Sequence, residues 1–459
     1  MASNNGSELI SGISAAKIVS FKSRQDSVYT AKRQTTKAAL GSVKPAFLSG
    51  VPMHWMLDWP MPYPMLVDKA WDASIRDIDG NELDDFCLGD TGSMFGHSPK
   101  PVAKAIRKQA KRGLTYMLPT EDALAVGELL TDIFGPFRWQ IATTASDANR
   151  FALRVARAVT GRKKTLVFNG CYHGAVDETF VKLKDGKTVM KSGLAGQAAD
   201  LTKNSVVAEF NDVAGLQKLL AAKDIACLIM EPVLTNSCMV LPQPGFLDAV
   251  RKLTRDAGTL LLIDETHTVS TGLGGYTRKH KLDPDIFVLG KPVAGGVAAA
   301  VWGLSQHVAD RFAVYNSSRE PGYSGIGTTL SANPLQFAAM RACLAQVMTS
   351  KNYAYMEKLA ARLEKGLAKV IEARKLPWHV ARVGARVEFI CAPGPLKTGA
   401  EAYAAHRPEL EAAIHTGLLN RGSLIAPFHN MMLISPVTRK RQVDRLIGNF
   451  AAVTLELTA

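Results

Sequence analysis

Short apolar runs alternate with longer segments of helical periodicity through the middle of the chain. The apolar runs lie at 140–143, 164–168, 206–210, 226–230, 259–264, 286–289 and 298–304, and the helical segments between them include 148–160, 213–222 and 244–257. Strands that alternate with helices of about 10–15 residues are typical of a mostly parallel sheet with helices on both faces. The pattern therefore predicts an α/β fold whose large domain, at 99–349, holds a seven-stranded sheet.

The pattern differs on either side of this domain. Residues 47–65 are rich in aromatic residues, Met and Pro, which excludes a helix there. The Asp-Gly-Asn turn at 79–81 predicts a hairpin. After residue 349 we expect a long helix at 352–374, strands at 379–383, 386–391 and 431–435, and helices at 408–421 and from about 438. We therefore expect a smaller α+β domain at 350–459, with residues 47–98 packed against it.

The first 46 residues are Ser-, Lys- and Arg-rich with few acids. This composition predicts a separate N-terminal arm at 1–46 that is mobile or lies on a partner. No apolar signal-peptide core is present, and no apolar stretch is long enough to span a membrane.

Composition narrows the function classes. The chain has 459 residues, 47% of them hydrophobic and 21% charged, as is usual for a soluble globular protein. The net charge of +14 is spread along the chain without compact basic runs and interleaved aromatics, so we expect neither nucleic acid nor a membrane as a partner. The six cysteines form no CxxC pair and no zinc-ligand spacing, so we expect no metal and a reduced, cytoplasmic setting.

Two strand ends carry residues of unusual chemistry. The apolar run 259–263 ends in Asp264, and the run 286–289 is followed by Gly290 and Lys291. In open α/β sheets, ligands bind beyond the carboxyl ends of the strands. Taken alone, Asp264 could equally be a residue that forms a turn or caps a helix. Taken alone, Lys291 could equally be a lysine whose side chain extends to solvent. Together they supply what pyridoxal phosphate (PLP) requires, an acid for the pyridine nitrogen and an amine that forms a Schiff base with the aldehyde.

Two further strand ends carry small or aromatic residues. The stretch 143–149 (Thr-Thr-Ala-Ser-Asp-Ala-Asn) precedes a helix, so its backbone N–H groups form an anion site, although simple N-capping by Ser146 explains it as well. The stretch 168–174 places Tyr172 and His173 between two glycines just after a strand. Tyr172 there is suited to stacking on a planar ring or to covering the end of the sheet.

Seven short motifs occur in the order found in one family. They are 144–148 (Thr-Ala-Ser-Asp-Ala), Tyr172-His173-Gly174, Asn211-Asp212, Glu231-Pro232, Asp264-Glu265, Gly290-Lys291 and 327–334 (Gly-Thr-Thr-Leu-Ser-Ala-Asn-Pro). On these motifs the chain resembles the class III aminotransferases of fold type I, especially the branch around glutamate-1-semialdehyde aminomutase and the omega-transaminases. The resemblance covers roughly residues 45–450.

The resemblance implies roles for individual residues. Lys291 would carry the cofactor as an internal aldimine, and Asp264 would keep its pyridine nitrogen protonated. The other implied cofactor contacts are Ala145 and Ser146 at the phosphate, Tyr172 on the ring, His173 in support of the pocket, Glu231 near the phenolic edge, and Thr329 at the phosphate of a neighbouring subunit in a homodimer. The chain departs from the family at Ala145, where glycine is usual, and at Thr266-His267, where many relatives have an aliphatic residue first.

The activity implied is a ping-pong transfer of an amino group from an amine or amino acid to a 2-oxo acid. Neither 50–59 nor 426–433 contains an arginine, the residue that best binds a carboxylate. With Trp55, Trp59 and Met431 as substrate-binding candidates, we therefore expect an apolar pocket and an amine (omega) transaminase.

Three alternatives stay open. An aminomutase would be expected to place a polar or acidic group near Met431. A β-amino-acid aminotransferase is the second alternative. Any carboxylate-bearing substrate, the acceptor included, would need one cation, and Arg382 or Arg386 is the candidate for a movable one. A structural protein with a borrowed fold is the non-enzyme alternative, against which the intact Asp264 and Lys291 argue.

Overall fold

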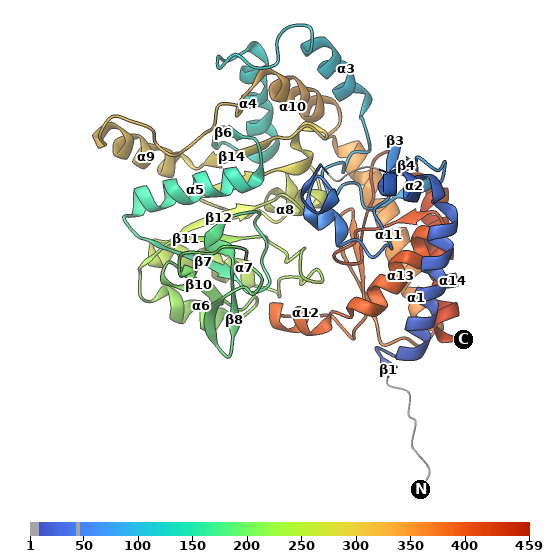
Figure 1. The fold of residues 1–459 in the computed structure, drawn as a ribbon. Helices are drawn as coiled ribbons and strands as arrows, with labels where there is room; N and C mark the ends of the chain where they lie inside the picture. The colour runs from blue at the N-terminus through green and yellow to red at the C-terminus, as the bar shows by residue number, and fades with distance from the viewer. Residues whose placement is uncertain (1–8, 43–45) are drawn as a thin grey trace. The chain divides into compact units, whose positions relative to one another are not determined.

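A computed structural model describes residues 9–42 and 46–459 of the chain (Figure 1). The chain forms two compact units. Unit 1 comprises Met1–Ser98, Tyr355–Pro395 and Ala405–Ala459, and unit 2 comprises Pro99–Ala354 and Leu396–Ala404. Among the described residues, no helix has the length and apolarity needed to cross a membrane.

Unit 2 is built on a seven-stranded sheet in the order β10-β7-β11-β12-β13-β14-β6. Its strands are β6 (Arg138–Ala142), β7 (Lys164–Phe168), β10 (Ser205–Ala208), β11 (Ile225–Met230), β12 (Leu260–Asp264), β13 (Ile286–Leu289) and β14 (Ala300–Leu304). Only β14 runs antiparallel to its neighbours. The predicted mostly parallel, seven-stranded α/β sheet is therefore confirmed, and each of the seven apolar runs forms a strand within two residues of its expected ends.

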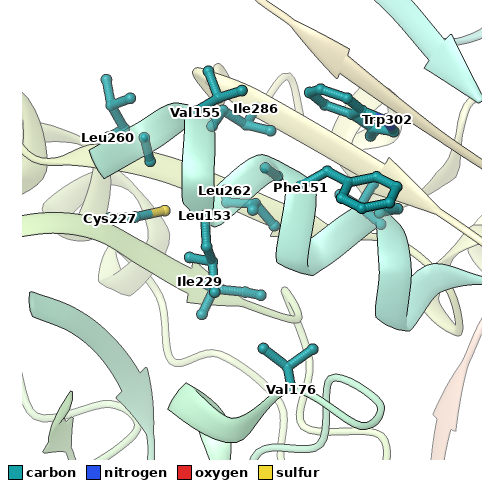
Figure 2. Close-up of a cluster of buried hydrophobic side chains, with 14 of the residues drawn as sticks. Phe151, Leu153, Val155, Val176, Cys227, Ile229, Leu260, Leu262, Ile286 and Trp302 are labelled. Atoms are coloured by element: carbon teal, nitrogen blue, oxygen red, sulfur yellow. The ribbon is translucent and has the colours of Figure 1, made fainter. Parts of the chain in front are cut away.

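Helices cover both faces of this sheet because successive residues of each strand point to opposite faces. On one face, α5 (Ala145–Thr160) packs on strand side chains in a buried cluster that includes Phe151, Cys227 and Trp302 (Figure 2). On the other face, Phe168 of β7 packs on Phe246 of α7 (Phe246–Ala257), with ring centroids 5.6 Å apart. Helices thus cover both faces of the sheet, and the ends of its strands are the part of the sheet that a ligand can reach.

The remaining elements of unit 2 surround this core. They are α3 (Lys100–Gln109), α4 (Glu121–Phe134), α6 (Val213–Leu220), α8 (Gly275–Lys279), α9 (Gln306–Ser318), α10 (Pro334–Gln346), the hairpin β8 (Val181–Lys184) and β9 (Lys187–Met190), and four 3-10 turns, η3 (Asp177–Thr179), η4 (Leu201–Lys203), η5 (Thr268–Thr271) and η6 (Lys291–Ala294). Helix α12 (Gly399–Ala405) also lies almost wholly in this unit.

Unit 1 is an α+β body assembled from both ends of the chain. Its two larger sheets have the strand orders β17-β5-β4-β3 and β15-β16-β18. The strands are β1 (Leu9–Ile10), β2 (Ile13–Ser14), β3 (Val67–Trp71), β4 (Ser74–Asp77), β5 (Glu82–Asp85), β15 (His379–Val383), β16 (Arg386–Ile390), β17 (Ser423–Leu424) and β18 (Met431–Leu433). The helices are α1 (Ala15–Lys32), α2 (Gln34–Ser42), most of α11 (Ser350–Ala373), α13 (Pro408–Asn420) and α14 (Lys440–Thr458), with the 3-10 turns η1 (Leu48–Gly50) and η2 (His54–Leu57).

The described part of residues 1–46 differs from the separate arm that its composition suggests. Helix α1 packs on α13 and α14 and buries Ile18, Phe21 and Tyr29. The exposed face carries the Ser, Lys and Arg residues that dominate the composition, so the buried stripe is easily overlooked. Residues 1–8 and 43–45 of the expected arm lie outside the described residues.

The segment 396–404 also departs from the expected division, because it belongs to unit 2 although its neighbours on both sides belong to unit 1. Two unit 2 side chains hold it. Glu209 Oε1 accepts the backbone N–H of Gly399 (2.7 Å), and Asn211 Nδ2 donates to the carbonyl of Lys397 (2.7 Å).

We expect Phe21→Ala to destabilise unit 1, since the ring is 1% exposed and lies against Gly417 of α13. Truncation of a buried phenylalanine costs about 3–5 kcal/mol of unfolding free energy. Val19 on the same helix is 65% exposed, so Val19→Ala is the matched control and should change stability by under ~0.5 kcal/mol. Urea denaturation followed by circular dichroism measures both, and equal stability of the two variants would mean that α1 is a dispensable arm.

Candidate active site

The candidate residues of unit 2 lie at one edge of its sheet. Strands β7, β11, β12 and β13 are parallel, and β6 shares their direction because β6 and β13 both run antiparallel to β14. Their carboxyl ends therefore meet at a single edge. The residues that follow those ends are Ala145 and Ser146 after β6, Tyr172 and His173 after β7, Glu231 after β11, and Lys291 after β13, while Asp264 is the last residue of β12.

Asp264 is buried, 3% exposed, and carries a dense set of hydrogen bonds. Asn149 Nδ2 donates to Oδ2 (3.0 Å), His173 Nδ1 lies 3.0 Å from the same oxygen, and the backbone N–H of Thr266 donates to Oδ1 (3.1 Å). Burial acts to raise the pKa of Asp264, but these hydrogen bonds and the imidazolium charge outweigh it and hold that pKa below its usual value. The site thus keeps a buried carboxylate ionised.

His173 is the charged partner of this carboxylate. Desolvation is the largest single effect and acts to lower the pKa of His173, but the hydrogen bond and charge of Asp264, together with contacts to Cys171, raise it to about 10. The imidazolium therefore supports the ionised Asp264. Its second nitrogen, Nε2, is buried and has no hydrogen-bond partner among the described residues.

The expected phosphate loop is the N-terminus of α5. The N-cap is Thr144, whose Oγ1 accepts the backbone N–H of Asp147 (3.2 Å), so Ser146 is not needed as a cap. Ala145 and Ser146 occupy the first turn, where backbone N–H groups have no partner inside a helix and the helix dipole favours an anion. The Ser146 Oγ accepts the N–H of Ala175 (3.0 Å), which ties this turn to the one that holds His173.

Lys291 lies immediately beside this helix end. A Cβ added to Gly290 would come within 2.7 Å of the Ala145 Cβ, so the two backbones approach as closely as a glycine permits. Lys291 itself has φ +46°, a left-handed conformation that is strained for any residue except glycine. Such strain persists only where the surroundings impose it, and it is concentrated at functional sites.

Glu231 is a second buried acid at this edge, 2% exposed. Its carboxylate accepts hydrogen bonds from the Thr235 hydroxyl and from Asn236 Nδ2 (3.1 Å). Desolvation nevertheless raises its pKa to about 7, against the opposing influence of His173 and of these hydrogen bonds. Glu231 is therefore poised between its two protonation states near neutral pH.

The two remaining candidates of unit 2 are exposed. Tyr172 has 51% of its surface accessible, and Thr329 lies exposed in the turn before α10. Both positions suit contacts with a group that is not part of this chain.

Two residues of the site carry no obvious sequence signal. Asn149 bridges Asp264 and the carbonyl of His173 (3.1 Å), and His267 Nε2 lies 3.0 Å from Lys291 Nζ. Asn149 ends the stretch 143–149, and His267 lies where the chain departs from the family, but neither position indicates in the sequence that its side chain contacts Asp264 or Lys291. Asn211-Asp212, by contrast, is structural, because Asn211 holds the 396–404 segment and Asp212 caps α6 by accepting the N–H of Gly215 (2.9 Å).

The substrate-binding candidates belong to unit 1. Trp55 is 40% exposed and lies edge-on to Phe428, while Trp59 lies edge-on to His415. Met431 is fully buried, and its partner across β16–β18 is Glu388.

The surroundings of Met431 are therefore less apolar than the sequence suggests. Residues directly opposite in an antiparallel pair share one face of the sheet. Burial raises the pKa of the Glu388 carboxyl to about 8, against the opposing charge of Arg386. An acidic group therefore does lie beside Met431.

Arg382 and Arg386 are both engaged within the unit. Arg382 Nε donates to Glu364 Oε2 (2.6 Å), and Nη1 lies 3.9 Å from Glu357. Arg386 is fully buried, donates to the Thr91 hydroxyl, and has Nη2 3.7 Å from Asp90 Oδ1. Neither guanidinium is the loosely held cation expected from the sequence.

The strand-edge residues of unit 2 fit PLP. The ionised Asp264 suits a protonated pyridine nitrogen, the first turn of α5 suits a phosphate, and Lys291 suits an aldehyde. The close approach of Gly290 to Ala145 places the lysine backbone next to the anion site.

We expect Gly290→Ala to weaken PLP binding about 5- to 150-fold, since the added methyl group meets Ala145 at 2.7 Å and overpacking of this kind costs about 1–3 kcal/mol. Gly127→Ala is the matched control, because no atom lies within 4 Å of its added Cβ. Equilibrium dialysis against PLP measures both affinities, and an unchanged Gly290→Ala affinity would remove this contact from the cofactor site.

Comparison with known proteins agrees with this chemistry. A family model, Aminotransferase class-III, matches residues 58–453. Glutamate-1-semialdehyde 2,1-aminomutase of Desulfitobacterium hafniense (strain DSM 10664 / DCB-2) is 33% identical over 369 residues, which cover 79% of this chain and 84% of the relative. A glutamate-1-semialdehyde-aminomutase from Pseudomonas aeruginosa PAO1 has a TM-score of 0.95 at 43% identity, and the match covers 97% of this chain and 100% of that protein's chain. A lysine-to-alanine variant of it, solved in complex with PMP, matches equally well.

An omega-transaminase from Sphaerobacter thermophilus shares the fold, with a TM-score of 0.84 at 24% identity over 92% of this chain and 98% of its own. The resemblance inferred from the seven motifs is thereby confirmed. The chain belongs to the class III aminotransferases, PLP-dependent enzymes of fold type I.

Proposed function

We propose that the protein is a transaminase that moves an amino group from an amine to a 2-oxo acid in two half-reactions at one site. The observation that carries this proposal is the pairing, at one strand edge, of Lys291 with a buried Asp264 whose carboxylate is held ionised by Asn149 and His173. The bound cofactor supplies an electron sink for the charge that develops when the substrate loses a proton.

Each residue of the chain has a distinct part in this proposal. Asp264 holds a proton on the pyridine nitrogen, and His173 keeps Asp264 ionised. Lys291 would carry the cofactor between turnovers. Its freed Nζ would then take the proton from the substrate carbon and deliver it to C4′ of the cofactor, so that Nζ ends the half-reaction without it. Tyr172 would stack on the ring of the cofactor, and Glu231 would contact its phenolic edge.

In this proposal the phosphate group of the cofactor is the part that the protein binds most directly through its backbone. The first turn of α5, with Ala145 and Ser146, binds it through backbone N–H groups and the Ser146 hydroxyl. Thr329, exposed in unit 2, is proposed to reach the phosphate of a second copy, so that a homodimer is the working form.

The choice of an amine as donor rests on the two arginines. A carboxylate binds best to an arginine that presents both its N–H groups. Arg382 is ion-paired with Glu364, and Arg386 is buried beside Asp90 and Thr91. A carboxylate would have to displace one of these contacts to bind either guanidinium, whether it belongs to an amino-acid donor or to the 2-oxo acid acceptor. With an amine donor this is required in only one of the two half-reactions.

Intramolecular transfer of the glutamate-1-semialdehyde aminomutase type is the second candidate. The relatives at 33% and 43% identity carry that name, and Glu388 places an acidic group beside Met431. The two candidates share the cofactor and the lysine and differ in whether the carbonyl product leaves the enzyme.

Asp264→Asn should lose at least ~2–4 kcal/mol of transition-state stabilisation, or roughly 30- to 1000-fold in kcat/KM, because an amide cannot hold the proton on the pyridine nitrogen. Asp212→Asn is the matched control, since it also removes a carboxylate charge but leaves an acceptor for the cap of α6. Near-normal rates in Asp264→Asn would assign Asp264 a purely structural role.

The donor is tested by initial rates on three substrates. We expect 1-phenylethylamine with pyruvate to give acetophenone and alanine at a higher rate than β-phenylalanine with pyruvate gives alanine. Glutamate-1-semialdehyde alone should not rearrange at a comparable rate. Rearrangement without consumption of pyruvate, together with inactivity on the amine, would replace the first candidate with the second.

A further inference from the structure

The amine of Lys291 has a partner from the neighbouring strand end. His267 Nε2 lies 3.0 Å from Lys291 Nζ, and the imidazole is 4% exposed. The contact joins the residue that follows β13 to the turn that follows β12, so it lies at the same sheet edge as Asp264. Nothing in the roles proposed above requires a histidine at this position.

The turn that carries His267 is fixed by the buried carboxylate of Glu265, which is fully buried. This carboxylate accepts the Thr268 hydroxyl (2.6 Å) and the backbone N–H groups of Tyr276 (3.1 Å) and Thr277. The carbonyl of His267 in turn accepts the Ser270 hydroxyl (2.9 Å). The backbone of His267 therefore has little freedom to move.

The same turn is tied directly to the lysine segment. Thr266 Oγ1 accepts the backbone N–H of Gly290 (3.2 Å), one residue from each member of the pair. Lys291, the next residue after Gly290, has the left-handed backbone conformation described above. His267 and Lys291 are therefore held at a defined separation by the backbone, and not only by their own contact.

We propose that His267 is the positioning residue for the Lys291 amine, holding Nζ in place whenever the lysine is not joined to the cofactor. The inference rests on the proposed function of Lys291. It assigns His267 the tautomer with hydrogen on Nδ1, so that Nε2 accepts a hydrogen bond from Nζ.

An acceptor at this position serves both forms of the lysine. The neutral amine and the ammonium each have an N–H to donate. When the lone pair of Nζ takes the proton from the substrate carbon, the C–H electron pair stays with the substrate and cofactor, and His267 neither gains nor loses a proton. The hydrogen bond therefore persists through proton uptake and release. An amine that is already oriented needs less reorganisation to reach the reactive geometry. Positioned groups raise reaction rates in this way.

Three substitutions separate the hydrogen bond from packing. His267→Gln places an amide near the position of Nε2, His267→Asn reaches only as far as Nδ1, and His267→Leu fills the space without an acceptor. His280→Leu is the matched control, since it removes a different histidine of unit 2, one stacked on Tyr276.

The first measurement is the half-reaction of the PLP-loaded enzyme with a donor deuterated at the reacting carbon, followed by cofactor absorbance without an acceptor. We expect the Leu and Asn variants to react at least about tenfold more slowly than wild type, with an unchanged donor Kd and a larger primary isotope effect. The Gln variant should stay within about threefold of wild type. A rate and isotope effect like wild type in His267→Leu, or a Gln variant as slow as the Leu variant, would overturn the proposal.

The second measurement needs no turnover. Cofactor-free protein is mixed with PLP, the lysine link is trapped with borohydride, and the labelled chain is counted by mass spectrometry. Capture should be at least about tenfold slower in His267→Leu, with unchanged reversible binding of PLP, and normal in His280→Leu. Normal capture in His267→Leu would contradict the positioning role, whereas a wild-type chain that captures PLP at another lysine would overturn the proposed function instead.

Discussion

A carboxylate that must stay ionised in the interior governs the arrangement of unit 2. Removing a charge from water is costly unless hydrogen bonds and an opposite charge replace the solvent. For Asp264 these come from three separate segments, since Asn149 lies on α5, His173 follows β7, and Thr266 follows β12. Each segment is therefore held by the same small group of atoms. The anion site at the start of α5 inherits its position from Asn149, which lies on the same helix.

The buried acids of the chain show that burial alone does not decide protonation. Asp264 keeps a lowered pKa because charged and neutral donors surround it, while desolvation prevails at Glu231 and Glu388 and raises their pKa values to about 7 and 8. Two protonation behaviours thus occur at one sheet edge, where the lowered pKa of Asp264 favours its ionised form and the raised pKa of Glu231 allows proton exchange near neutral pH. Such divergence between neighbouring carboxyl groups is typical of sites that move protons.

Local pattern was sufficient to predict the sheet and its ligand-bearing edge. The runs at 164–168 and 286–289 coincide with β7 and β13, because buried strands of such a sheet are mostly apolar and end sharply. Helix α5 begins three residues earlier than its periodicity suggests, since Thr144 provides the cap. Asp264 and Lys291 stood out because charged residues rarely end such strands.

Contacts between residues far apart in the sequence could not be predicted from the local pattern of apolar and polar residues. His173 and Asp264 are 91 residues apart, and only strand order brings their side chains together. Helix α1 looked like an arm because its three buried hydrophobic residues are a weak signal among many polar ones. The acid beside Met431 depends on the register of β16 and β18, which neither strand reveals by itself.

Each unit contains segments from distant parts of the sequence, and this affects when its contacts can form during synthesis. Unit 1 pairs α1, near the beginning of the chain, with α13 and α14, near its end, and unit 2 takes in 396–404 long after its own sheet is complete in sequence. Phe21 thus leaves the ribosome hundreds of residues before Gly417, against which its ring lies, and a long delay also separates Glu209 from its partner Gly399. Pairings of such sequence separation form slowly and leave apolar side chains exposed meanwhile. Nascent chains of this protein should therefore depend on chaperones that shield α1 until translation ends, even though the finished sheet of unit 2 is assembled from neighbouring segments.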